Sequence, residues 1–199
     1  MELDDATCPW NESLMCLFED VYGFAAVGPR RHDDWTHDVV AVLRREVGDP
    51  RGWLQIDMDL ENSARDSIPS YPFALPDAVR LPEHLHPIAR EAAVGALAVM
   101  SEEWDGECYR VRSRPDKDVR LNHARTVLDR FGPAAGYWTN SSLAVGHASP
   151  DFVAASLRGT RSHSFVTSEY INGLDLVADF GLIAVNDSEV GAFWAVEAI

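Results

Sequence analysis

Two apolar segments near the end of the sequence constrain the fold more than any other feature. Residues 174–185 and 189–196 consist largely of aliphatic, β-branched and aromatic side chains, which favour strands. Between them lie Asn186, Asp187 and Ser188, residue types that are common in tight turns. The pattern predicts a C-terminal β-hairpin, whose apolar faces require other elements to pack against them.

Five further segments have the apolar spacing of helices. The longest extends from about Pro82 to Trp104, with its regular part beginning near Pro87, and residues 88–100 are apolar on nearly every side. We therefore expect a central, buried helix near residues 88–103. The other four helices are predicted at about 12–21 with Asn11 as N-cap, 34–47 with Asp33 or Asp34 as N-cap, 116–131, and 150–157 with Ser149 as N-cap.

The remaining strands are shorter than the hairpin. Residues 53–60 alternate between polar and apolar side chains, as in a strand with one buried face, and further strands are predicted at 22–27, 109–113 and within 134–145. The connecting segment 62–82 is rich in proline, which excludes a regular helix interior. The sequence therefore predicts a single α+β domain over residues 1–199, with a mixed or antiparallel sheet and the hairpin packed against several helices.

Acidic residues outnumber basic ones in this chain by nearly two to one. There are 32 acids and 17 bases, which give a formal net charge of −15. The surplus is uneven, because residues 1–50 carry 11 acids and 4 bases whereas residues 101–150 carry 7 of each. Such a chain lacks the basic face that nucleic-acid phosphates require, so we exclude direct nucleic-acid binding. A basic protein is the expected partner, because a negative field steers it and accelerates association.

The chain is expected in the cytoplasm, without membrane contact. Its first dozen residues are acidic and polar, and its longest apolar run, residues 92–100, is too short to span a bilayer. The three cysteines, Cys8, Cys16 and Cys108, have no metal-type spacing, which fits reduced thiols in the cytosol.

One predicted strand carries the best candidate contact surface. Trp53, Asp57 and Asp59 lie on the same face of residues 53–60, and Glu61 follows directly. An aromatic ring beside a row of carboxylates suits a cationic ligand or the Lys and Arg side chains of a partner. A solvated strand face is the alternative interpretation. We add the acidic pair Asp33 and Asp34, which precede the second predicted helix, to the candidate binding residues.

The densest polar cluster suggests a metal site. His32, Asp34, His37 and Asp38 offer imidazole and carboxylate groups, and the last three share one face if a helix begins near Asp34. The competing interpretation is an acidic helix start, in which these carboxylates favour the positive end of the helix dipole.

Signatures of known catalytic sites are missing from the sequence. It contains no phosphate-binding loop, dinucleotide fingerprint, H-E-x-x-H motif or G-x-S-x-G elbow. The leading hypothesis is therefore an acidic protein-binding domain that captures or inhibits a basic partner, as immunity proteins and antitoxins do, without a cofactor. The alternative is a metal-dependent hydrolase or small-molecule-binding enzyme that uses the His32–Asp38 cluster and the Asp57/Asp59 face.

Overall fold

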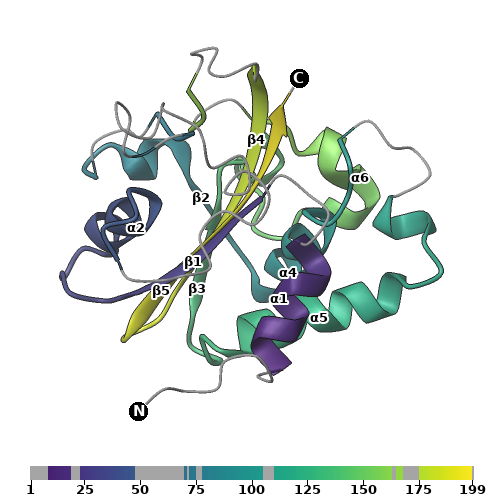
Figure 1. The fold of residues 1–199 in the computed structure, drawn as a ribbon, viewed down its shortest axis with the longest axis horizontal. Helices are drawn as coiled ribbons and strands as arrows, with labels where there is room; N and C mark the ends of the chain where they lie inside the picture. The colour runs from purple at the N-terminus through teal and green to yellow at the C-terminus, as the bar shows by residue number, and fades with distance from the viewer. Residues whose placement is uncertain are drawn as a thin grey trace, which may run out of the picture.

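The structure is a computed structural model that describes most of the chain (Figure 1). The described residues are 9–18, 23–47, 70, 72–74, 78–104, 110–162, 165–167 and 175–198. The predicted strand at 53–60 and most of the proline-rich segment lie outside these ranges. Every helix in the described ranges is too short or too polar to cross a membrane.

A five-stranded antiparallel sheet forms the centre of the molecule, in the order β1-β5-β4-β3-β2. The predicted hairpin is confirmed, since β4 (Leu176–Val185) and β5 (Glu189–Ala198) pair along their length around the turn at residues 186–188. The other strands are β1 (Gly23–Pro29), β2 (His86–Ile88) and β3 (Gly136–Thr139).

The sheet is buried on both faces, which explains why its strands have almost continuous apolar sequences. Successive side chains of a strand point to opposite faces. In β4, Phe180, Leu182 and Ala184 belong to one hydrophobic core, whereas Ile183 and Val185 belong to the other. The hairpin therefore separates two cores and contributes to both.

Four helices cover one face of the sheet, and α2 (Trp35–Leu43) lies on the opposite side (Figure 1). The four are α1 (Pro9–Phe18), α4 (Arg90–Val99), α5 (Lys117–Asp129) and α6 (Phe152–Gly159). Residues 92–99 of α4 are all buried, so the expected central apolar helix is confirmed. With this helix and the hairpin in place, the α+β fold class is confirmed and the sheet is antiparallel.

Short 3-10 helices complete the described chain. They are η2 (Leu81–His84), η4 (Val111–Ser113) and η5 (Ser142–Ala144). Leu81, Leu85 and Phe73 join α2 in the second core, together with Phe165 and Val166. Residues from widely separated parts of the sequence therefore build the layer that contains α2.

Two predicted elements differ from the structure. The helix expected from Pro82 is split into η2, the strand β2 and then α4, because residues 86–88 pair with β3. Pro87 is tolerated there because β2 is an edge strand, where the missing N–H of proline costs no ladder hydrogen bond. The strand expected at 109–113 is wrong for its described part, which forms η4. There the Val111 N–H donates to the Glu102 carboxylate instead of to a neighbouring strand.

Two predicted N-caps are also wrong. Helix α1 begins at Pro9, so Asn11 lies inside it. Helix α6 is capped by Asp151, whose carboxylate accepts from the Ala154 N–H, and not by Ser149. In both cases several adjacent residues can act as caps, and tertiary packing selects the helix start.

Candidate functional site

The candidate site in the described part of the chain is the turn before α2 together with the first turn of that helix. Asp34, one of the two predicted caps, caps the helix in an extended conformation with φ −88° and ψ 112°. Its Oδ1 accepts from the Thr36 N–H at 3.0 Å and from the Thr36 hydroxyl at 2.8 Å. These hydrogen bonds hold the pKa of Asp34 below its ordinary value. The carboxylate is therefore ionised at neutral pH and fixed at the start of the helix.

Asp38 is almost completely buried, with 2% of its side chain exposed. It accepts from the backbone N–H groups of Arg31 at 3.1 Å and His32 at 3.3 Å, and from His32 Nδ1 at 2.7 Å. Burial raises the pKa of Asp38, but the hydrogen bonds from His32 and from the two backbone groups outweigh it, so the pKa lies below its ordinary value. Asp38 is therefore an ionised carboxylate that organises the turn.

Arg30 connects this turn to the central hairpin. Its Nε lies 3.3 Å from Asp38 Oδ2, and its two terminal nitrogens donate to carbonyl oxygens of the turn and of Asn186. The Arg30 N–H also donates to the Ser188 carbonyl at 2.8 Å. Arg30 was not among the residues predicted from the sequence, although a pair of bases shortly before an acidic cluster is a signal for such a role.

The two histidines of the cluster lie at the surface. The His32 side chain is 54% exposed, and His37 is exposed one turn into α2. Their ring centres are 5.5 Å apart and the ring planes are inclined by 36°. The predicted four-residue metal site does not assemble, because the described residues contain no group of three or more His, Cys, Asp or Glu side chains that could hold a metal ion.

A pair of tryptophans lies beside the acidic turn. Trp35 in the first turn of α2 stacks on Trp138 of β3, with ring centres 4.5 Å apart and planes inclined by 34°. Both side chains are half-buried and pack against the second core. The structure thus places an aromatic pair next to Asp33 and Asp34. Of the other predicted binding residues, Trp53, Asp57, Asp59 and Glu61 lie outside the described residues.

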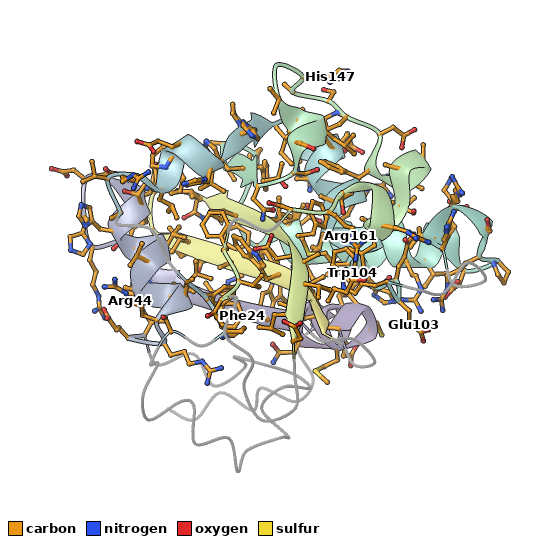
Figure 2. All side chains as sticks on the ribbon, turned by 90° about the horizontal axis from the view of Figure 1, so that it is seen from above. Phe24, Arg44, Glu103, Trp104, His147 and Arg161 are labelled. Carbon is orange, nitrogen blue, oxygen red and sulfur yellow. The ribbon has the colours of Figure 1, made fainter. Side chains whose placement is uncertain are left out.

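Another polar cluster lies where α6 meets the end of the hairpin. Arg161 forms an ion pair with Glu197, and its guanidinium is 5.8 Å from the centre of the Trp104 ring (Figure 2). Nearby, Asp179 is fully buried in β4 and accepts from Asn140 Nδ2 at 2.8 Å and from the Phe165 N–H at 2.9 Å. These contacts join β3, β4 and the segment 165–167, so the cluster stabilises the fold.

The described residues are nearly balanced in charge. They include 15 of the 17 bases but only 18 of the 32 acids. Eight of these bases form ion pairs with the chain's own carboxylates: Arg30–Asp38, Arg80–Glu83, Arg90–Asp129, Arg114–Asp116, Arg120–Asp116, Arg125–Glu91, Arg130–Glu189 and Arg161–Glu197. The remaining 14 acids are accompanied by only two bases, Arg51 and Arg65, in the rest of the sequence.

Comparisons with known proteins give no relative for this chain. No protein-family model, no curated protein and no solved structure matches it.

Proposed function

We propose that this protein captures a basic protein partner through its acidic surplus, in the manner of an inhibitor or immunity protein. The observation that carries the proposal is the separation of charge along the chain. Most of the bases lie in the described fold, where eight arginines pair with internal carboxylates. The chain as a whole carries 32 acids against 17 bases, so its negative charge exceeds what its own bases can neutralise.

Electrostatics gives this arrangement two consequences for binding. A strong negative field attracts a positively charged partner over several ångströms and raises the association rate, an effect that salt screens within about 10 Å at 0.1 M ionic strength. Arginine side chains of the partner can also form two parallel hydrogen bonds with each carboxylate. Binding of this kind is therefore strongly dependent on ionic strength.

The contact residues that we assign are acidic and aromatic. Asp57, Asp59 and Glu61 follow Trp53 in the sequence. Asp33 and Asp34 directly precede Trp35, whose half-buried ring stacks on that of Trp138. Tryptophan is frequent among the residues that dominate binding energies at protein interfaces. Carboxylates around such a ring favour a cationic side chain over its face.

A peptide titration tests the proposal with the full-length protein. The probe is a fluorescent peptide of alternating Arg and Gly, and the control peptide alternates Glu and Gly. We expect the Arg peptide alone to bind at low ionic strength, with an affinity that falls as NaCl is added. The triple variant Asp57→Asn/Asp59→Asn/Glu61→Gln should weaken binding roughly tenfold, or ~1.4 kcal/mol.

The matched control removes the same three charges elsewhere. Glu12, Glu46 and Asp187 are exposed on α1, after α2 and in the hairpin turn, and form no ion pair within the described part of the chain. The variant Glu12→Gln/Glu46→Gln/Asp187→Asn should retain most of the affinity. Equal losses in both variants would contradict a localised contact surface, and a failure to bind the Arg peptide at low salt would overturn the proposed function.

A further inference from the structure

We propose that His32 and His37 together bind a divalent transition-metal ion, and that Asp38 positions His32 without coordinating the ion. The observations behind this inference are the hydrogen bond that orients one ring, the distance between the two rings and their exposure. They are independent of the acidic surplus on which the proposed function depends.

The buried Asp38 carboxylate fixes the orientation of the His32 ring. His32 Nδ1–H donates to Asp38 Oδ1 at 2.7 Å, because the ionised carboxylate can only accept. Asp38 is itself held by the Arg31 and His32 N–H groups and by Arg30. In the neutral ring, a proton on Nδ1 leaves Nε2 with a free lone pair on the opposite side of the ring. Histidines that bind metals commonly donate their second nitrogen to a carboxylate in this way, which fixes the ring and increases its basicity.

The second imidazole lies at a suitable distance. His37 is exposed on the first turn of α2, and its ring centre is 5.5 Å from that of His32. Zinc–nitrogen bonds of about 2.0–2.1 Å in a tetrahedral site place two imidazole centres about 5–6 Å apart. The separation of the two ring centres therefore matches that of two imidazoles on one ion, and both side chains are open to solvent.

The donor set determines which ions fit. Two neutral imidazoles suit Zn²⁺, Ni²⁺ and Cu²⁺, whereas Mg²⁺ and Ca²⁺ prefer oxygen ligands. Within the described residues no third side chain completes the site, so water or a donor from a partner occupies the other positions. Asp34 contributes charge, since it lies close enough to His37 to interact electrostatically with it. We expect modest affinity in the order Cu²⁺ above Ni²⁺ and Zn²⁺.

Metal titration of the full-length protein tests the inference. The protein is treated with EDTA, desalted and titrated with ZnCl₂ and NiCl₂ by calorimetry, and the Cu²⁺ complex is examined by electron paramagnetic resonance. We expect one ion per chain at this site and nitrogen hyperfine structure from two imidazoles. His32→Ala and His37→Ala should each weaken binding at least tenfold. Both variants should fold, because His37 is exposed and Asp38 keeps its hydrogen bonds from the Arg31 and His32 backbone N–H groups when the His32 ring is removed.

Two further variants test whether the changes in metal affinity are specific to this site and to its orientation by Asp38. His147 is exposed in the loop after η5, outside this cluster, so His147→Ala should leave the titration unchanged. Asp38→Asn should weaken binding about 10- to 100-fold through loss of ring orientation, with the spectrum still showing two nitrogens. A titration that neither His32→Ala nor His37→Ala alters would overturn the site, and unchanged affinity in Asp38→Asn would overturn the positioning role.

Discussion

At the scale of single residues, the position of one tryptophan ring explains one glycine. Gly181 of β4 pairs with Trp194 of β5, and the indole ring lies across the glycine. A Cβ atom built on Gly181 would be 2.1 Å from the ring carbon Cε2, far inside van der Waals contact. Trp194 is fully buried and packs edge-on against Phe73 and Phe165, so the ring has no room to move. The large ring in the second core therefore requires a glycine beside it.

Two glycine substitutions should have opposite effects on stability. Gly181→Ala introduces a clash with an immobile ring and should lower the free energy of unfolding by about 1–3 kcal/mol. Gly95→Ala in α4 meets only ordinary contacts, the nearest being 3.6 Å away at Val153, and should raise it by about 0.5–1 kcal/mol because alanine favours the helix. Urea unfolding of both variants measures the difference. Equal shifts in the same direction would contradict the packing described around Trp194.

At the scale of elements, one buried carboxylate joins three segments. Glu102 follows α4 and is 1% exposed. Its two oxygens accept from the Val111 N–H of η4 at 2.7 Å and from the Leu157 N–H of α6 at 2.8 Å. Helix α6 is interrupted immediately before this contact by Ser156, whose φ of 60° is unusual for a residue other than glycine. The carboxylate therefore holds a strained helix against the end of α4.

The protonation of Glu102 should make stability depend on pH. Burial raises the pKa of Glu102 above 4.5, although both backbone hydrogen bonds and the charges of Arg110 and Arg112 oppose the shift. The folded state therefore binds this proton more tightly than the unfolded state. The resulting stabilisation is complete below the unfolded pKa and is lost as pH rises through the folded pKa.

Glu102→Gln removes this titration. We expect the free energy of unfolding of the variant, minus that of the wild type, to increase as pH rises from about 4.5 through the folded pKa of Glu102. Urea unfolding at several pH values between 4 and 7 measures it. A difference that stays constant or falls with pH would show that the folded pKa of Glu102 is not raised.

At the scale of the whole molecule, the hairpin lies between the two hydrophobic cores. Strands β4 and β5 lie in the middle of the sheet order and face a hydrophobic core on each side. Strand β2 is different, because it has three residues, contains Pro87 and lies at an edge. Local opening should therefore begin at β2 and leave the hairpin intact.

Hydrogen exchange should reveal this order. We expect the amides of β4 and β5 to exchange only through global unfolding, whereas the amides of His86 and Ile88 exchange through smaller openings with a lower free energy. Exchange measured by NMR at several low urea concentrations distinguishes the two classes. Equal protection of β2 and the hairpin would contradict this distribution of stability.

The sequence by itself determined the elements whose signals are local. The hairpin, the acidic cap of α2 at Asp33 or Asp34 and the buried helix near residues 88–103 were all predicted, because turn chemistry, capping and apolar periodicity act between neighbours along the chain. The acidic surplus was also visible from composition alone.

Only the tertiary structure decided how distant residues meet. It made a strand of residues 86–88, since β3 supplies the hydrogen-bond partners, and a 3-10 helix of residues 111–113, since Glu102 accepts there. It also buried Asp38 beneath the His32 ring, whereas the sequence spacing predicted Asp38 as a metal ligand on one helix face with Asp34 and His37. Burial and partner choice depend on contacts between segments far apart in the chain, and no local pattern encodes them.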